Sequence, residues 1–296
     1  MRGIAATAFP FTGALLLSSF IFILSSTPVL ALNSPVTGLN LISAGLKLAS
    51  YSSLNWGGYF VNKSTFTYAS AEWTVPAVSS TVSGDSAVWV GIGGVLGNGY
   101  LIQTGTEQDC GSGAVSGVKY HGLADQVASG QYPTGSSDGH TFIVAKRLGK
   151  CTPSYYAWWE TWPANAEQKI STISVSPGNK MEAYIKETGT DNWTITITDL
   201  NNSETFSKTV SFAPNTGTAE AITERPEICS RTCSLTKLAD FGTVKFSDAA
   251  AGSSTNYFNL LHNNSVTMVD SRGAVLASPS ALSTDGVFSM TWERSS

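Results

Sequence analysis

The chain has 296 residues, of which 13% are charged, and its formal net charge at pH 7 is −4. This length suits one large domain or two small ones. The sequence contains no basic patch, which argues against a nucleic-acid partner. A surface with so few ionisable groups changes its net charge little in acid, although an ordinary secreted β-protein rich in Ser and Thr would share this composition.

Residues 1–31 have the pattern of a secretory signal peptide. Arg2 is the only charged residue before Lys47, an apolar run covers 14–24, and small residues lead up to Ala31. That run is short for a membrane span of about 20 residues. We therefore expect cleavage after Ala31, secretion, and no membrane attachment afterwards.

Residues 32–50 form either a pro-segment or a flexible N-terminus, whereas 51–296 predict a single β domain. In the best example of period-two alternation, Trp193, Ile195 and Ile197 alternate with threonines. Turn residues such as Pro, Gly and Asn separate the apolar runs. The expected strands cover 55–62, 70–76, 86–94, 100–106, 155–163, 171–188, 192–200, 204–213, 219–228, 241–246, 257–263, 265–270 and 287–293.

Helical patterns are nearly absent, and the strongest candidate is the brief stretch 164–168. Short strands with few or no helices predict an all-β fold, a sandwich of two large antiparallel sheets of the jelly-roll or concanavalin-like kind. Residues 108–150, which are rich in Gly and Ser, interrupt the regular succession of expected strands and are interpreted as a long insertion. Its role as a lid, a partner surface or a stability device stays open.

Four cysteines in an exported chain indicate disulfides in preference to a metal site. They allow three pairings, and proximity favours Cys110–Cys151 and Cys229–Cys233. The first pair would staple the two ends of the insertion. Because no Cys-x2-Cys pair occurs and the chain has only 3 histidines, we expect no metal and no other cofactor.

Most familiar catalytic arrangements are missing. A serine hydrolase needs a histidine base, but His121 and His140 lie in the insertion and no Gly-x-Ser-x-Gly turn exists. A Cys–His pair needs a free thiol, which export disfavours, and the paired Asp-Thr/Ser-Gly turns of an aspartic protease are absent. What remains are carboxyl and amide side chains in strand-like runs, namely Gln103, Glu107, Glu160, Glu220 and Glu224.

Each of these groups has both a structural and a chemical interpretation. A buried amide such as Gln103 needs hydrogen-bond partners, whatever its function. A carboxyl held against aromatic rings, as Glu160 would be among its neighbouring tryptophans, has a raised pKa and can act as a base and then as an acid. Taken singly, each is better explained as a solvent-facing or capped side chain.

The aromatic residues support a rival function. Trp158, Trp159 and Trp162 could form a platform that stacks on sugar rings. Glu160 and Glu224 could act as the carboxyl pair of a glycosidase. A secreted carbohydrate-binding or glycan-cleaving sandwich therefore stays an alternative.

Six sequence blocks, taken in order, resemble the glutamic peptidases, also called eqolisins. They extend over roughly residues 55–250, and a single Gln-Thr-Gly would be a weak signal without the others. The blocks are NWGGY (55–59), AVWVGIGG (87–94), LIQTGTE (101–107), YYAWWETWP (155–163), AEAITERPE (219–227) and LADFGTVKF (238–246).

The resemblance implies a secreted, acid-acting endopeptidase that acts on proteins or peptides, without a cofactor and as a monomer. It implies a dyad in which Glu224 is general base and then acid, while Gln103 donates to the oxyanion. An inactive descendant that only binds peptides is a further alternative. Substrate-binding or supporting positions fall on Trp56, Gly58, Trp89, Gly94, Glu107, Trp158, Glu160 and Trp162.

This chain departs from the fungal members of that family at several positions. Gly93, Glu107 and Tyr156 stand where those enzymes have Asp, and Trp162 stands where they have Tyr. The insertion at 108–150 is also far longer. The resemblance therefore implies activity without fixing the cleavage preference or the pH optimum.

Overall fold

The computed structural model describes residues 50–62, 65–95, 99–111, 117–124, 126–127, 150–253, 256–259 and 264–296. All of them belong to one compact unit, Leu46–Ser296. The expected signal peptide, the segment 32–49, His140, His262 and most of the insertion lie outside the described residues. A search of the described part of the chain finds no helix with the length and apolarity needed to cross a membrane.

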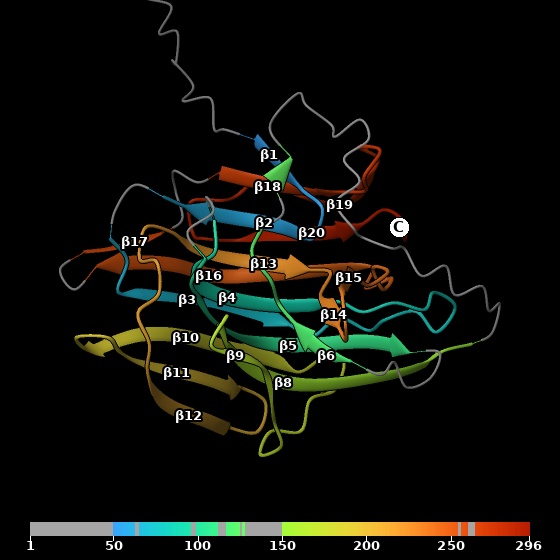
Figure 1. Cartoon of the computed structure of the whole chain (residues 1–296). Coiled ribbons are helices and arrows are strands. Elements are labelled where there is room, and N and C mark those ends of the chain that lie inside the picture. The colour runs from blue at the N-terminus through green and yellow to red at the C-terminus, as the bar shows by residue number, and fades with distance from the viewer. Residues whose placement is uncertain are drawn as a thin grey trace, which may run out of the picture. The chain divides into compact units, whose positions relative to one another are not determined.

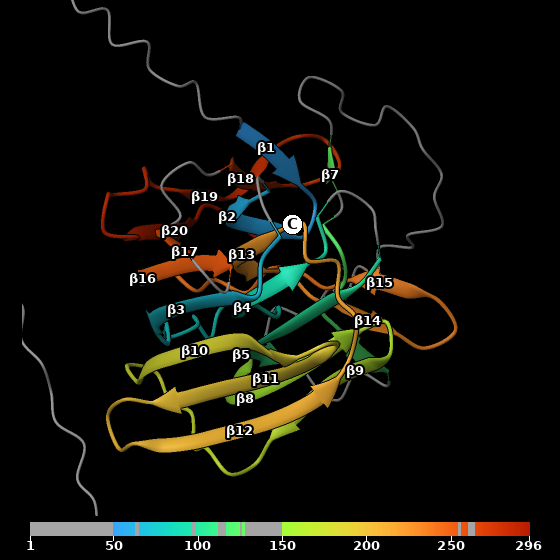
Figure 2. The ribbon, with the colours of Figure 1, turned by 90° about the vertical axis from the view of Figure 1, so that its left-hand side faces the viewer.

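The strands form two packed layers, seen from two sides in Figures 1 and 2. The first layer has the order β7 (Gln126–Val127), β1 (Ser50–Ser53), β18 (Asn264–Val269), β2 (Trp56–Val61), β13 (Ala219–Glu224), β4 (Ala87–Gly93), β5 (Leu101–Gly111), β8 (Thr152–Trp162) and β9 (Asn165–Ile170). The second has the order β12 (Glu204–Ser211), β11 (Asn192–Asp199), β10 (Lys180–Gly189), β3 (Tyr68–Thr74) and β16 (Thr243–Ser253), followed by β17 (Asn256–Asn259) and β20 (Phe288–Trp292) on one edge of β16, and β19 (Val275–Pro279) beyond β20.

Hydrogen bonds join the two layers at one side, where β18 pairs with β19. Neighbouring strands are antiparallel, apart from the parallel pair β1 and β18. A separate small sheet consists of β6 (Val118–Tyr120), β14 (Glu227–Cys229) and β15 (Cys233–Leu235). Together these pairings confirm the expected all-β sandwich.

Alternation along the strands fills the space between the layers. On β11, Trp193, Ile195 and Ile197 are buried in the core, as the period-two pattern predicts. The threonines between them face outward and form a ladder of hydroxyl contacts with β12, for example Thr194 with Thr209 at 3.0 Å. One face of the strand therefore supplies apolar burial while the other links neighbouring strands.

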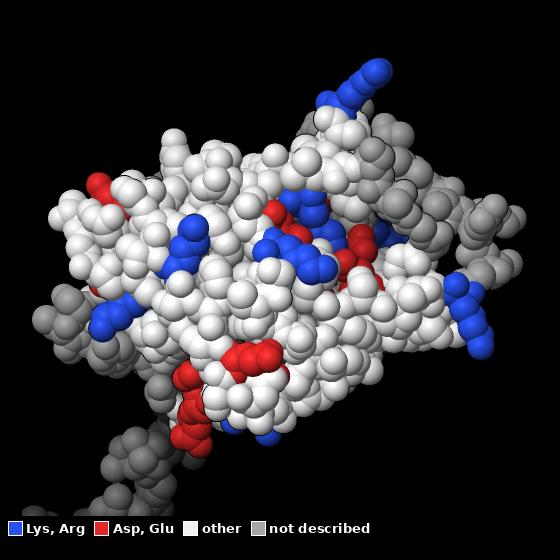
Figure 3. All heavy atoms as spheres, turned by 90° about the horizontal axis from the view of Figure 1, so that it is seen from below, with Lys and Arg blue, Asp and Glu red and all other residues white. Residues whose placement is uncertain are grey.

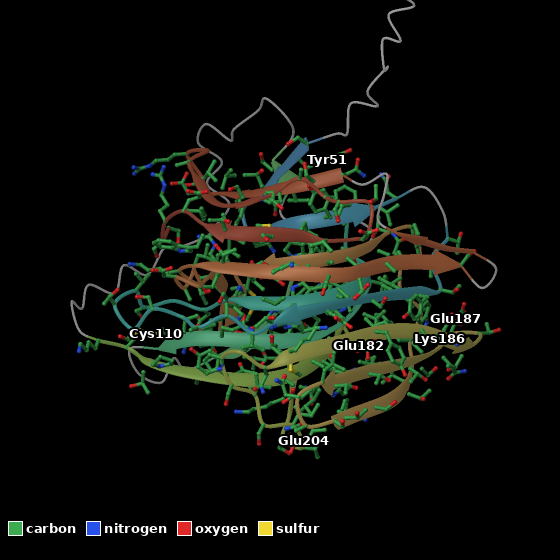
Figure 4. The ribbon with its side chains drawn as sticks, turned by 180° about the vertical axis from the view of Figure 1, so that it is seen from behind. Tyr51, Cys110, Glu182, Lys186, Glu187 and Glu204 are labelled. Atoms are coloured by element: carbon green, nitrogen blue, oxygen red, sulfur yellow. A yellow bond between two sulfur atoms is a disulfide. The ribbon has the colours of Figure 1, made fainter. Side chains whose placement is uncertain are left out.

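The same division holds on β10. Met181, Ala183 and Ile185 point into the core, while Glu182 and Lys186, labelled in Figure 4, point away from it. Burying a large apolar side chain stabilises the fold by about 1.5–3 kcal/mol, so these regular strands hold the site-bearing layer in place.

Both disulfides favoured by the sequence are present. Cys110 and Cys151 join the end of β5 to the residue before β8, and both are buried. Cys229 and Cys233 link β14 to β15. The first bond holds two neighbouring strands of the first layer together at the base of the insertion.

The structure corrects three details of the expected elements. The helix expected at 164–168 is wrong, because residues 165–168 belong to β9, which pairs with β8. A helix of five residues is too short to be stable alone, whereas strand pairing satisfies the same main-chain groups. The strand expected at 171–188 begins only at Lys180. β5 continues to Gly111, so the insertion begins later than residue 108.

Candidate active site

One face of the first layer carries the side chains that the family resemblance indicated. Gln103 of β5 pairs with Glu160 of β8. Glu224 of β13 and Glu107 of β5 both pair with Ala87 of β4, which lies between them. Side chains alternate between the faces of a sheet, so all four polar groups point the same way. The same face also carries Trp56, Gly58, Trp89, Trp158 and Trp162.

Two glycines allow close packing on this face. Gly58 has a φ of 141°, and a Cβ there would collide with the Ala221 carbonyl. Gly94, just after β4, has a φ of 89°, and a Cβ there would lie 2.9 Å from the Trp56 ring. Both φ values disfavour residues with a side chain. These positions therefore keep the first layer close-packed beside the site.

Glu224 is completely buried and is held by three side chains. The Trp89 indole donates to its Oε2 at 2.7 Å, and the Asn55 amide donates to its Oε1 at 3.4 Å. The Nδ1 atom of His121 lies 3.3 Å from Oε2. Burial raises the pKa of Glu224, and the contacts with His121 and Trp89 offset part of that rise.

Gln103 is also completely buried, and its two side-chain polar atoms differ in their hydrogen bonding. Nε2 donates to the main-chain carbonyl of His121 at 2.7 Å and to Glu160 Oε2 at 3.2 Å. Oε1 has no hydrogen-bond partner among the described residues. Glu160 Oε2 also accepts the His121 N–H at 2.9 Å. Burial raises the pKa of Glu160 well above its usual value, against the opposing influence of His121.

His121 occupies the centre of the site, and sequence reasoning missed it. Its ring stacks on Trp158 with centroids 3.8 Å apart and an interplanar angle of 12°. Nε2 donates to Glu167 Oε2 at 3.0 Å and lies 2.9 Å from Glu107 Oε1. The side chain is fully buried. No pattern marks this residue, because its part of the insertion has no hydrophobic periodicity.

The carboxyl groups around the imidazole set its charge. Burial alone lowers the pKa of His121, but the hydrogen bonds with Glu107, Glu167 and Glu224 raise it well above its usual value. Burial alone raises the pKa of Glu167, but its hydrogen bond with His121 makes the net shift a lowering. The imidazole therefore holds its proton more firmly than a free histidine does, between acidic groups from three strands.

Asn55 and Glu167 are two further site residues that the sequence did not indicate. Asn55 opens the NWGGY block, which is its only signal, and its amide also donates to the Leu123 carbonyl at 3.0 Å. Glu167 lies on β9, where the sequence suggested a helix. A helical turn there would not predict that Glu167 shares a sheet face with Trp158.

A cavity of about 580 Å³ opens beside the site and is lined in part by charged residues. Lys119 lies in its wall, with Nζ 2.7 Å from Asp109 Oδ2 and 3.1 Å from Glu107 Oε2. Burial raises the pKa of Asp85, another lining residue, to about 7. Figure 3 shows acidic and basic side chains gathered in a hollow on one face of the molecule.

Within the described residues, two groups have the spacing of metal ligands. Glu227 stands beside Cys229 and Cys233, but these cysteines form a disulfide and offer no thiolate. The ligand atoms of Glu107, His121 and Glu167 lie within 4.8 Å of one another. Nε2 of His121 lies between Glu107 Oε1 and Glu167 Oε2, at 2.9 and 3.0 Å, which are the distances of hydrogen-bonded ion pairs.

The tryptophans do not form the single aromatic platform on which the sugar-binding alternative depends. Trp158 is fully buried on the site face, under the His121 ring. Trp159 packs against the core on the opposite face. Trp162 shares the site face, but its ring contacts Tyr120 edge-on at 5.2 Å. No flat stack of the three rings is available to a sugar.

Comparisons with known proteins agree with this arrangement. Aspergillopepsin-2 of Aspergillus niger is 30% identical over 207 residues, which cover 69% of this chain and 65% of that protein. Scytalido-glutamic peptidase, solved with a transition state analog inhibitor, has a TM-score of 0.60 at 22% identity, and SCP-B, an eqolisin solved with the tripeptide Ala-Ile-His, has 0.57 at 21%. Each match covers 82% of this chain and 100% of the solved one, so the fold is shared. Since the model described as the Peptidase A4 family matches residues 54–134 and 137–291, this chain belongs to the Peptidase A4 family.

Proposed function

We propose that this protein is an endopeptidase that hydrolyses peptide bonds with Gln103 and Glu224. The observation that carries the proposal is the environment of one peptide group. The carbonyl of His121 accepts a hydrogen bond from the Gln103 amide, and the His121 ring lies against the Glu224 carboxyl. A substrate peptide held in the same way would present its carbonyl to Gln103, on the sheet face that also carries Glu224. Membership of a peptidase family supports the same substrate class.

The chemistry follows from the donors and acceptors of the two side chains. Glu224 takes a proton from a water molecule, and the water oxygen bonds to the carbonyl carbon. The negative charge that develops on the carbonyl oxygen is stabilised by the Gln103 amide N–H. Glu224 then returns the proton to the leaving nitrogen as the C–N bond breaks. The products are a carboxylic acid and an amine, and the proposed reaction requires no cofactor.

Neighbouring groups orient the two reacting side chains. The free Oε1 of Gln103 is available to accept a hydrogen bond from the attacking water. Glu160 holds the Gln103 amide, and Trp89 holds the Glu224 carboxyl. Both supports are buried, which limits competition from solvent. The dyad is therefore preorganised by residues of β4 and β8.

The proposed reaction takes place outside the cell and in acid. The signal pattern of residues 1–31 and the two disulfides support secretion. Burial raises the pKa of Glu224, so this carboxyl holds a proton at a pH where an exposed glutamate is already ionised. A group that must accept and then donate a proton works best near its own pKa. This supports action on the acidic side of neutrality.

The test compares wild type with Gln103→Ala and Glu224→Gln on a denatured protein substrate, from about pH 2 to pH 7. Pepstatin is present to suppress contaminating aspartic proteases. Loss of the Gln103 donor should lower kcat about 10²–10³-fold. Glu224→Gln should lower it further, because Glu224 is the only proton-transfer group in the scheme. Matched controls are Glu182→Gln on β10 and Asn202→Ala in the turn between β11 and β12, both far from the site in sequence.

Far-UV circular dichroism and disulfide titration establish that each variant is folded. If a folded Gln103→Ala or Glu224→Gln protein keeps wild-type turnover, the dyad is wrong. If folded wild type cleaves nothing at any pH but retains peptides on a column, the protein is an inactive peptide binder. Retention on immobilised polysaccharide without proteolysis would support the carbohydrate-binding alternative instead.

A further inference from the structure

Residues 118–124, here called the site segment, cross the site in the manner of a bound peptide. At one end β6 pairs antiparallel with β14, and just beyond the other end β7 pairs antiparallel with β1. Between these strands, the His121 N–H donates to Glu160 and its carbonyl accepts from Gln103. Addition of an extended chain to existing strands is a common mode of peptide recognition, in which main-chain hydrogen bonds supply affinity.

The contacts continue beyond His121. The Gly122 carbonyl accepts a hydrogen bond from the Trp56 indole at 3.1 Å. The Ala124 N–H donates to the Gly94 carbonyl at 3.2 Å. Trp56 and Gly94 therefore bind main-chain atoms on the carboxyl side of His121, as Gln103 and Glu160 do at His121 itself. These contacts use main-chain groups that every peptide has, so they do not depend on the sequence of the site segment.

Side-chain selectivity comes from the pocket that holds the imidazole. One wall of this pocket is the flat face of Trp158, against which the ring stacks. Its end carries the carboxyl oxygens of Glu107 and Glu167, at 2.9 and 3.0 Å from Nε2. An aromatic wall and an acidic end form a site for a cation, because the ring face and the carboxylates both attract positive charge.

We propose that the site segment is an internal ligand of the peptide-binding site, and that the pocket around His121 is a subsite for a positively charged substrate side chain. This inference rests on the proposed function and adds the substrate class. The side chain in question belongs to the residue whose carbonyl Gln103 holds, on the acyl side of the bond that breaks. A substrate enters by displacing the site segment and placing its own basic side chain between Trp158 and Glu167.

Basic side chains differ in how they would fill this pocket. Arginine stacks its planar guanidinium on an aromatic ring and offers several N–H donors to carboxylates. Lysine reaches the same oxygens with a point charge. Methionine has a similar length without the charge, so it serves as the neutral reference. Glutamate places a third acidic group beside Glu107 and Glu167, and the pocket should exclude it.

The experiment uses one peptide sequence with Arg, Lys, His, Met or Glu at the residue before the cleaved bond. Wild type, Glu167→Gln and the control Glu182→Gln are compared by kcat/KM. Wild type should prefer the Arg and Lys peptides over the Met peptide by about tenfold or more, since charge-assisted hydrogen bonds contribute about 1.5–3 kcal/mol. Glu167→Gln should remove most of this preference, so that kcat/KM for the Arg peptide falls toward the value for the Met peptide in the same variant.

The ratio of kcat/KM for the Arg peptide to kcat/KM for the Met peptide separates side-chain specificity from effects that change both rates. Weaker binding of the site segment in Glu167→Gln raises both rates and cancels in the ratio. If Glu167 only stabilises the fold, the variant changes its unfolding midpoint but keeps the wild-type ratio, and the inference is overturned. A wild-type enzyme that cleaves all five peptides equally well overturns it too.

The subsite can also be tested by measuring peptide binding, which does not depend on catalysis. The same peptides are titrated by calorimetry into Glu224→Gln, in which hydrolysis is blocked, and into a double variant that also carries Glu167→Gln. Tighter binding of the Arg peptide than the Met peptide, lost in the double variant, supports the subsite even if wild type hydrolyses nothing. In that case the proposed function fails and the subsite stands. Equal affinities in Glu224→Gln overturn the subsite.

Discussion

The side-chain amide of Gln103 donates a hydrogen bond of 2.7 Å to the main-chain carbonyl of His121. In the proposed reaction the same amide N–H donates to the substrate carbonyl, and the two cannot be bound together. Peptide binding therefore competes with a segment of the protein's own chain. The apparent affinity for substrate equals the intrinsic affinity multiplied by the fraction of molecules in which the site segment is displaced, so it is low while that fraction is small.

Removing the His121 side chain should favour the displaced state. His121→Ala loses the stacking on Trp158 and the ion pairs with Glu107 and Glu167. We expect kcat/KM for a peptide substrate to rise about tenfold near pH 6, because each 1.4 kcal/mol lost from a competing interaction gives a factor of ten. Val118→Ala is the control, since Val118 belongs to the same segment but is half exposed.

The measurement is kcat/KM at matched fractions of folded protein. An unchanged or lower value for folded His121→Ala, with Val118→Ala like wild type, would mean that the site segment assists catalysis and does not compete with substrate.

The site segment should be held more weakly in strong acid. The lowered pKa of Glu167 and the raised pKa of His121 leave a window between them in which the carboxylate and the imidazolium are both charged. As pH falls through the folded-state pKa of Glu167, its carboxylate is protonated and the ion pair is lost. As pH rises through that of His121, the imidazolium is lost instead. Between these limits the segment is held most firmly.

Other charged groups lie around the ring, four of them acidic and one basic. The groups that face His121 from the packed strands and from its own segment are Glu107, Glu160, Glu167, Glu224 and Lys119. Protonation of Glu167 and Glu224 in acid removes charged acceptors from the imidazolium, whereas Glu160 faces the His121 main-chain N–H. Hydrogen exchange should show residues 117–124 protected at about pH 6 and faster, after correction for intrinsic rates, at about pH 3. Equal protection at both values would exclude release by acid.

The alternation rule explains how much of the site could be predicted from the sequence. Gln103 and Glu107 are four residues apart on β5, and Trp158 and Glu160 are two apart on β8, so each pair must share a sheet face. Because Gln103 pairs with Glu160, both pairs of residues then lie on the same face of the sheet. The role of each residue in catalysis stays a prediction, but their common location follows from the even spacing.

His121 and Glu167 could not be found in this way. The part of the insertion that carries His121 has no apolar repeat, and its place is set by hydrogen bonds to residues far away in the sequence. Glu167 lies in a polar stretch, Asn165–Ile170, whose local pattern does not predict a strand. Pairing with β8 overrides local preference there. Contacts of this kind depend on tertiary structure, which the hydrophobic periodicity of a sequence does not reveal.

Glu220 should make the protein more stable in acid than at neutral pH. It is almost fully buried, and neither carboxyl oxygen lies at hydrogen-bond distance and angle from a partner among the described residues, although the nearby Thr218 side chain offsets part of the rise in its pKa. Burial raises its pKa well above the usual value, so the folded state keeps the proton while the unfolded state releases it above about pH 4.3. Folding stability therefore falls as pH rises through that range.

Glu220→Gln replaces this acid with a neutral group of the same shape. The variant should be more stable than wild type at about pH 7, by about 1.4 kcal/mol for each unit of pKa difference removed, and close to wild type at about pH 3. Urea unfolding at both pH values measures this, with Glu182→Gln as the control on the second layer. A Glu220→Gln protein that is less stable at neutral pH would show that the ionised carboxylate has a partner.

Trp89 should act as a positioning residue for Glu224. Its indole N–H donates to the carboxylate at 2.7 Å, and its ring packs edge-on against Trp56 with centroids 4.7 Å apart. Trp89→Phe keeps an aromatic ring and removes the donor. Because a hydrogen bond to the charged form favours ionisation, its loss should raise the pKa of Glu224 further. The acid limb of the kcat/KM profile should then move to higher pH.

The expected loss in kcat/KM at the acid optimum is about tenfold or more, since hydrogen bonds to charged groups contribute about 1.5–3 kcal/mol. The shift of the acid limb distinguishes positioning from loss of packing, which lowers the rate equally at every pH. Trp193→Phe is the matched control, because this buried indole lies in the core between the layers. A Trp89→Phe profile that is lower but unshifted would show that the indole N–H does not set the ionisation of Glu224.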